Sequence, residues 1–230
     1  MSKVSSDFPA TKRIGIFVFN EFEPLDVWGF VEAFSVARFI GTNEADFTRC
    51  PFTIELISNE LTTGSSSDVP QPIKSSNGPR VVPEWFRDQA CEQAFDLLMI
   101  PGGEGTRFLL DPANPEAVNE LLEWVRVMDK QVPMVTSVCT GAAILASAGL
   151  LDGKPATTNR QAFPWVASFG PKVLWDNVAR WVDADKYVTS AGVSAGTDMA
   201  FHLVSRIAGR AVAEAAATAA EYDWQRDPYK

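Results

Sequence analysis

Short, uninterrupted apolar runs alternate with segments of helical character along this chain, and this alternation constrains the fold more than any other feature. Four such runs occupy residues 14–19, 52–57, 97–100 and 134–138. Runs this short and continuous are typical of strands that are covered on both faces, as the strands of parallel sheets are. Helical patterns follow three of the runs, at residues 25–40, 116–128 and 140–150. The sequence therefore predicts an α/β fold, with a doubly wound, mostly parallel sheet and helices on both faces.

Turn-forming residues and helix caps predict several smaller features. Residues 59–83 are rich in Ser, Pro, Asn and Gly, which predicts a surface excursion with a small antiparallel hairpin. Asn114 is the expected cap of the helix at 116–128, with Pro115 in its first turn. Gly41 is expected to close the helix at 25–40.

The remaining elements complete one continuous unit. The turn sequence DADK predicts a pair of strands at 179–182 and 187–190. Three further helices are expected at residues 161–169, 195–208 and 210–222. The chain shows no linker, repeat or low-complexity boundary, so residues 13–230 are predicted to form a single domain. Residues 1–12 are polar and are expected to be frayed or disordered.

The charge balance and the scarcity of histidine exclude several functions. The chain carries 20 Lys+Arg and 29 Asp+Glu, a formal net charge of −9. Nucleic acids and anionic membranes are bound by basic surfaces, so neither is an expected partner. His202 is the single histidine, which excludes a metal site built from two or three histidines. We expect no metal and no cofactor.

Cysteine usage indicates a reducing compartment. Cys50, Cys91 and Cys139 are far apart and show no CxxC spacing, which is typical of free thiols. Residues 1–13 lack the apolar core of a signal peptide, so a cytoplasmic location is expected. Residues 133–151 carry no charge over a length that could cross a bilayer. Their glycines and their change of pattern instead predict a buried strand that turns into a buried helix.

Cys139 is the best candidate for a chemically reactive residue. It lies where the run at 134–138 ends and the helix at 140–150 begins, followed by small residues. A tight turn at such a place projects the side chain into the crevice at the carboxyl ends of the strands. The unpaired amides of a helix N-terminus favour a thiolate, so we expect a lowered pKa for this thiol. The alternative is a small buried core cysteine, which is the common fate of free Cys.

Two glycines and two acids are predicted at the same crevice. Gly102 and Gly103 directly follow the run at 97–100, where glycine lets the backbone aim N–H groups at a ligand. With the amide that follows Cys139 they could form an oxyanion hole, although most such pairs are only turns. Glu23 and Asp26 lie between the first run and its helix, where a carboxylate could exchange a proton with the thiol or the substrate. A helix cap or first-turn charge is the commoner role of Asp26.

Asp198 and His202 share the helix at 195–208. Asp198 lies near its start and is open to the same two interpretations, as a helix-start charge or a site residue. His202 lies one turn further along an apolar helix, where a histidine is usually packed and hydrogen-bonded. Cys139 is therefore expected to work without a histidine base, through the turn, the helix terminus and a carboxylate.

Four stretches of the chain, in this order, closely resemble the ThiJ/PfpI superfamily, which has a class I glutamine amidotransferase-like fold, and within it the isonitrile hydratase branch. They read IGIFVFNEFEPLDVWG, DLLMIPGGEGT, VTSVCTGAAILASAGLLDGKPATTN and TSAGVSAGTDMAFHLV. The resemblance covers nearly the whole chain after the polar N-terminus. It implies a flavodoxin-like domain, a cysteine at a nucleophile elbow, a small electrophilic substrate and a homodimer.

The resemblance also implies roles for single residues. Cys139 matches the nucleophile, and Thr140 matches the neighbour whose amide and hydroxyl serve the site. Asp26 matches the acid that contacts substrate or water, and Gly103 the oxyanion contributor. Asp198 matches the acid of the late AGxD motif.

The chain departs from the family pattern at two positions. Many relatives have His where this chain has Asn159, and others place His directly after the cysteine, where Thr140 stands here. These departures disfavour protease-type and glyoxalase-type chemistry.

Three hypotheses follow from the residues and the resemblance. The first is an isonitrile hydratase-like enzyme that forms a thioimidate on Cys139 and releases an N-substituted formamide. The second is another cysteine-dependent lyase or hydrolase, for example one acting on an α-oxoaldehyde. The third is a non-enzymatic redox-responsive or ligand-binding protein.

Overall fold

A seven-stranded sheet with the strand order β10-β11-β7-β6-β1-β2-β5 forms the centre of the computed structural model, which describes residues 9–40, 50–60 and 70–230. Neighbouring strands are parallel except for β10, which runs antiparallel to β11. The strands are β1 (Lys12–Val18), β2 (Phe52–Ser58), β5 (Trp85–Phe86), β6 (Leu97–Ile100), β7 (Met134–Val138), β10 (Trp181–Ala184) and β11 (Tyr187–Ser190). The predicted mostly parallel sheet is confirmed.

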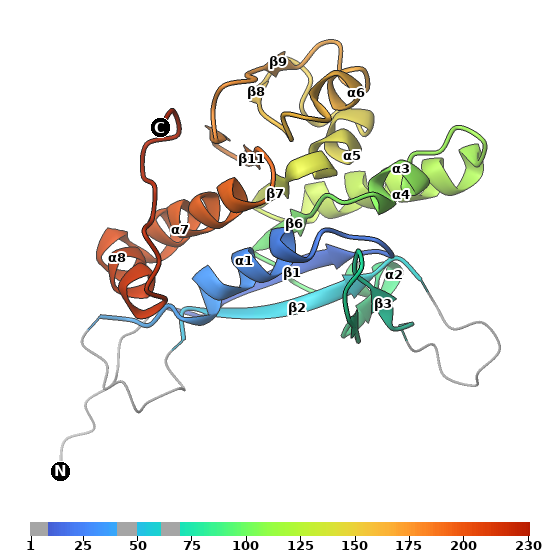
Figure 1. Ribbon diagram of the computed structural model, residues 1–230. Helices are drawn as coiled ribbons and strands as arrows, with labels where there is room; N and C mark the ends of the chain where they lie inside the picture. Colours follow the sequence, from blue (N-terminus) through green and yellow to red (C-terminus); the bar gives the residue numbers. More distant parts are fainter. Residues whose placement is uncertain (1–8, 41–49, 61–69) are drawn as a thin grey trace.

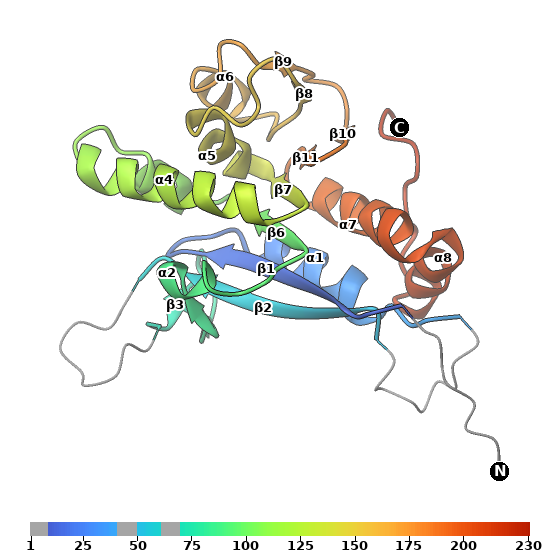
Figure 2. The same cartoon turned by 180° about the vertical axis from the view of Figure 1, so that it is seen from behind.

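Helices cover both faces of this sheet (Figures 1 and 2). They are α1 (Pro24–Ser35), α2 (Arg87–Ala90), α3 (Gly105–Leu109), α4 (Pro115–Gln131), α5 (Ala142–Ser147), α6 (Phe163–Ala167), α7 (Ser194–Ala208) and α8 (Arg210–Ala219). Helices α1, α7 and α8 pack together, and α1 lies in front of β1 in Figure 1. Figure 2 shows the molecule from behind, and there α4 lies in front of the sheet.

Aromatic contacts on the two faces explain why the strands read as continuous apolar runs. The ring of Phe17 on β1 packs against Trp124 of α4, with ring centroids 4.8 Å apart. On the α1 face, Phe34 stacks on Phe30 and meets Phe52 of β2 edge-on, both at 4.7 Å. Because residues of both parities are buried, no polar face remains along β1.

The predicted hairpin is confirmed, and short elements were missed. β3 (Ile73–Lys74) pairs antiparallel with β4 (Arg80–Val81) within the predicted surface excursion. β5, α2, α3 and the two-stranded pair β8 (Pro155–Ala156) and β9 (Leu174–Trp175) were not predicted. Elements of two to five residues are too short to show a period in the sequence.

The helix ends differ from prediction where side chains and turns stop the helix early. α1 ends at Ser35 rather than at Ile40, and the guanidinium of Arg38 donates to the carbonyl oxygens of Ser35 and Ala37, each at 2.7 Å. The predicted stop at Gly41 lies outside the described residues. α6 and α8 are likewise shorter than predicted.

The predictions for the start of helix α4 and for the start of the chain had different outcomes. Pro115 occupies the first turn of α4, as predicted. Asn114 precedes it at the cap position, but its side chain makes no capping hydrogen bond. Most of the predicted frayed segment 1–12 lies outside the described residues, while Lys12 already begins β1.

The uncharged stretch at 133–151 is a strand followed by a short helix, as predicted. β7 runs into a single 3-10 turn at Cys139–Gly141, and α5 follows directly. Among the described residues, no helix has the length and apolar character that a membrane crossing requires.

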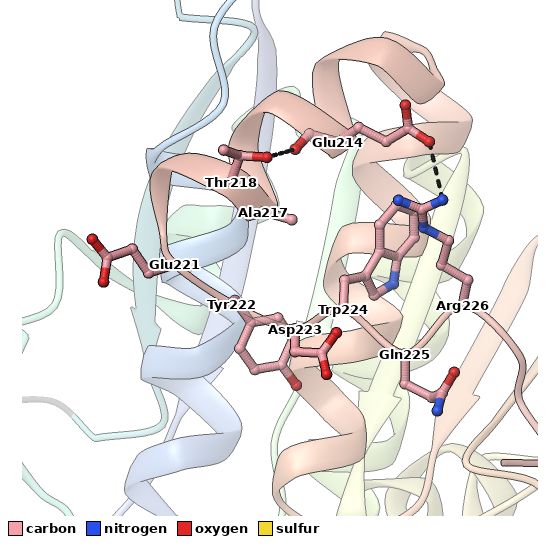
Figure 3. Close-up of a pocket in the computed structure, with 9 residues that line it drawn as sticks. All are labelled: Glu214, Ala217, Thr218, Glu221, Tyr222, Asp223, Trp224, Gln225 and Arg226. Carbon is pink, nitrogen blue, oxygen red and sulfur yellow. Dashed lines mark hydrogen bonds and ion pairs between the residues drawn. The ribbon is translucent and has the colours of Figure 1, made fainter.

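The chain after α8 returns along α7 and is held there by Asp198. The buried carboxylate of Asp198 pairs with Arg180 and accepts hydrogen bonds from the Tyr222 hydroxyl at 3.1 Å and the Gln225 amide at 2.9 Å. The indole of Trp224 donates to the Asp198 carbonyl oxygen at 3.1 Å. A surface hollow of about 630 Å³ lies between α8 and this segment (Figure 3).

These contacts predict that Asp198→Asn destabilises the protein rather than changing its chemistry. The substitution removes the charge that pairs with Arg180, and breaking a buried ion pair costs about 3 kcal/mol or more. Urea unfolding should show this loss, with Asp152→Asn at an exposed ion pair as the matched control. A variant of unchanged stability and lost turnover would instead make Asp198 a site residue.

Candidate active site

Four loops at the carboxyl ends of neighbouring strands build the candidate site. β11, β7, β6 and β1 are adjacent in the sheet, so the segments that follow them meet at one edge. The segment after β1 carries Glu23 and Asp26, and the segment after β6 carries Gly102. Cys139 directly follows β7, and Val193 lies just after β11. Residues that are far apart in the sequence are thereby gathered around one thiol.

The backbone of Cys139 has the strained geometry of a nucleophile elbow. Its φ is 58°, in the left-handed region that residues with a side chain rarely adopt. The turn fits only because its neighbours are small. A Cβ on Gly141 would lie 2.3 Å from the carbonyl oxygen of Ile100, and a Cβ on Gly102 would lie 2.7 Å from the Cβ of Cys139. The elbow and the β6 loop therefore touch backbone to backbone.

Asp26 is a fully buried carboxyl group beside this thiol. Its Oδ2 accepts a hydrogen bond of 2.8 Å from the Gly102 amide, while its Oδ1 has no hydrogen-bond partner. Burial raises the pKa of Asp26 to about 7, while the hydrogen bond from the Gly102 amide and the proximity of the Val193 amide and the Cys139 thiol oppose the rise. A carboxyl group with such a pKa can take up and release a proton near neutral pH.

The thiol of Cys139 has a raised pKa, which reverses the prediction of a lowered one. Its side chain is 6% exposed, and burial together with the charge of Asp26 raises the pKa of Cys139 to about 12. The Thr140 amide and the Asn159 side chain lower the pKa, but by less. One short 3-10 turn offers too few amides to outweigh desolvation. At neutral pH the resting pair thus keeps its proton on sulfur.

A cavity of about 450 Å³ opens onto the thiol. Its walls are mostly polar and come from six segments of the chain: Glu23, Ser76, Asn77, Gly103, Glu104, Arg107, Cys139, Thr140, Asn159, Gln161, Ala162 and Val193. The chain's only histidine is not among them. His202 lies elsewhere on α7, where its Nε2 is 2.7 Å from Asp183 and its ring faces Trp181, in line with the packing role expected of it.

The two glycine amides are already bonded within the protein. The Gly102 amide donates to Asp26, and the Gly103 amide donates to Thr140 Oγ1 at 3.1 Å. Neither N–H is free in this structure, and the oxyanion role predicted for the two glycines stays a prediction. The Thr140 hydroxyl also bonds Thr106 Oγ1 at 3.0 Å, so it braces the glycine loop.

The other predicted acids hold different positions. Glu23 lines the cavity and caps α1, with its carboxylate accepting from the Leu25 amide at 3.5 Å. Asp198 is not among the residues that line the cavity. Its carboxylate faces Arg180 and the C-terminal segment, which the sequence motif alone did not indicate.

Val193 is a site residue that sequence reasoning did not single out. It lines the cavity, and its φ of 53° and ψ of −93° are strained for a β-branched residue. Such strain costs about 1–3 kcal/mol and persists only where the surroundings impose it. Here the strained turn sets the Val193 amide against Asp26. A β-branched residue between two small ones carries no sequence signal for this role.

Burial of Asp26 predicts that Asp26→Asn stabilises the protein increasingly as pH rises. A raised pKa means that folding favours the protonated acid, so its contribution to stability is full below about pH 4 and is lost as pH rises through 7. The isosteric amide keeps an acceptor for Gly102 without this penalty. Urea unfolding at pH 5 and pH 8 should show the variant gaining about 2 kcal/mol over wild type between the two. A pH-independent difference would contradict the raised pKa.

Comparison with known proteins agrees with this architecture. The model of the DJ-1/PfpI family matches residues 12–206. The crystal structure of a THiJ/PfpI family protein from Pseudomonas syringae has a TM-score of 0.72 at 26% identity, covering 97% of this chain and 82% of that one.

Two curated relatives share part of the sequence. The isonitrile hydratase of Pseudomonas putida is 33% identical over 152 residues, which cover 66% of this chain and 61% of that protein. The glutathione-independent glyoxalase DJR-1.2 of Caenorhabditis elegans is 28% identical over 149 residues, which cover 65% of this chain and 73% of that protein. The match thus spans about three-fifths of the hydratase. Because the family model matches residues 12–206, which is most of this chain, the chain belongs to the DJ-1/PfpI family.

Proposed function

We propose that this protein is a cysteine-dependent enzyme of the isonitrile hydratase type, which adds water to R–NC and releases an N-substituted formamide. The observation that carries the proposal is the proximity of a fully buried acid with a pKa near 7, Asp26, to the elbow thiol of Cys139, which itself lines a cavity whose walls include no histidine. The similarity to the hydratase of Pseudomonas putida supports the same reaction class.

The first half of the reaction needs one proton to move twice. Ionised Asp26 takes the proton of the Cys139 thiol, and the sulfur attacks the terminal carbon of the isonitrile. Protonation of Asp26 removes the charge that had raised the thiol pKa, so the transfer itself eases formation of the thiolate. Asp26 then returns the proton to the attacked carbon. The product is a neutral thioimidate, R–N=CH–S–Cys139.

The second half adds water and expels the thiol. Asp26 takes a proton from water as its oxygen attacks the thioimidate carbon, and returns that proton to the nitrogen. The resulting R–NH–CH(OH)–S–Cys139 collapses when Asp26 moves the hydroxyl proton to the departing sulfur. The carbon–sulfur bond breaks, a formamide leaves and the resting pair is restored. Covalent catalysis thus splits one difficult addition into two easier ones.

A glyoxalase-type reaction is the second candidate, because the relative from Caenorhabditis elegans is named for that activity. It would use the same thiol to attack the aldehyde carbon of an α-oxoaldehyde and would yield a hydroxy acid. Methylglyoxal as substrate separates the two candidates, since only this reaction forms lactate. A redox-sensing role receives less support, because a buried thiol of raised pKa holds little of the thiolate that peroxide attacks.

Both members of the pair are predicted to be essential for isonitrile turnover. Cys139→Ala should abolish it, and Asp26→Asn should reduce kcat by about 10²–10⁴-fold, the usual contribution of a positioned acid or base. Formation of the formamide from aryl and alkyl isonitriles, followed by ultraviolet absorbance, measures both. Cys91→Ala, at a thiol away from the cavity, and Asp152→Asn at the surface are the matched controls. No turnover by the wild type across several isonitriles would refute the proposal.

The pH dependence of turnover is predicted to follow Asp26. The base must be ionised to take the thiol proton, so kcat/KM of the wild type should rise with pH and level off above about 7. The residual activity of Asp26→Asn should lack this limb. If kcat/KM of the variant rose with pH over the same range, the titration would belong to another group.

A further inference from the structure

Asn159 is held firmly at the wall of the thiol cavity by the two threonines that precede it. The buried Thr157 amide donates to Thr189 Oγ1 on β11 at 2.8 Å. The buried Thr158 hydroxyl donates to the carbonyl oxygen of Cys139 at 2.7 Å. The segment after β8 is therefore fastened both to the sheet and to the elbow, and Asn159 follows directly.

The side chain of Asn159 has a fixed orientation. Its Oδ1 accepts the Ala162 amide at 3.0 Å, which turns the Nδ2 group to the opposite side. There Nδ2 fills the space that a side chain at Gly192 would need, because a Cβ on Gly192 would lie 2.3 Å from it. Because Ala162 occupies the oxygen of the side chain, the Nδ2 group is what Asn159 can offer as a hydrogen-bond donor. Asn159 and Cys139 line the same cavity.

The amides of the glycine loop are not available as donors to negative charge on the sulfur. The Gly102 and Gly103 amides are bonded to Asp26 and Thr140. The Thr140 amide and the Asn159 side chain lie near enough to the Cys139 sulfur to lower the pKa of the thiol. Arg107, the cationic side chain among the cavity walls, is stacked on Trp165 at 4.3 Å and lies 3.6 Å from Glu104.

We propose that Asn159 is a catalytic residue, whose Nδ2 donates to the sulfur of Cys139 and stabilises its negative charge each time that charge forms. In the proposed reaction, on which this role rests, the charge forms when Asp26 takes the thiol proton and again when the sulfur is expelled. A side-chain amide cannot carry a proton at these pH values, so proton movement stays with Asp26.

Alkylation of Cys139 by iodoacetamide tests this role without any substrate. The rate, followed by mass spectrometry of the Cys139 peptide between pH 6 and 10, reports the thiolate present. Asn159→Ala removes the donor. Asn159→Asp keeps the size and the acceptor for Ala162, so its fold is retained while the donor becomes an acceptor. Both variants should be alkylated about tenfold more slowly at pH 8, because a hydrogen bond to a charged group is worth at least this factor.

Turnover and a matched control complete the design. Both variants should lower kcat for isonitrile hydration about tenfold or more with little change in KM, whereas Asn119→Ala on the exposed face of α4 should leave both rates unchanged. If the alkylation rate of Cys139 is unchanged in Asn159→Ala, the proposal is overturned. This holds even if Asn159→Asp is alkylated more slowly, because the added negative charge alone would explain that effect. Slower alkylation of both variants in a protein without isonitrile turnover would retain this role and refute only the proposed function.

Discussion

The burial of one carboxyl group, Asp26, beside one thiol is the constraint on which the site depends. In water these groups would titrate independently and far apart. In the protein, loss of solvent raises the pKa of both, and the ionised acid raises that of the thiol further. The Gly102 amide holds one oxygen of the acid, and the Val193 turn adopts strained backbone angles next to it.

In the proposed reaction, Asp26 and Cys139 would divide the chemical work in a way that one residue alone could not. A thiolate that persisted at rest would be open to oxidation and alkylation, whereas a thiol of pKa about 12 is inert until a base acts on it. The proposed base is Asp26, whose pKa of about 7 lets it titrate near neutral pH. In the proposed reaction the thiol would therefore become reactive only during turnover, when the acid takes the proton and its own charge disappears.

Much of the fold was predictable from the sequence, because continuous apolar runs report burial on both faces and their order implies a parallel sheet. The position of Cys139 at a strand end was likewise visible, and so were the acids after β1. The sign of the thiol pKa shift was not, because it depends on desolvation by distant segments rather than on the local turn. No local sequence pattern encodes the hydrogen bonds that the Gly102 and Gly103 amides make within the protein. The same holds for the pairing of Asp198 with Arg180. No sequence pattern predicts the strained backbone angles at Val193 either.

The adjacency of β11, β7, β6 and β1 has a consequence for how the site comes into existence. Its residues run from Glu23 to Val193, so most of the chain separates its two ends, and no fragment that lacks either end can assemble it. Contacts of such sequence separation form late and slowly, because the entropy of closing long loops is lost before the contacts compensate it. A nascent or partly folded chain therefore leaves Cys139 in water, where the thiol titrates as an ordinary one. Folding is thus what protects this sulfur, and accessibility of the thiol measures how completely the central strands have joined.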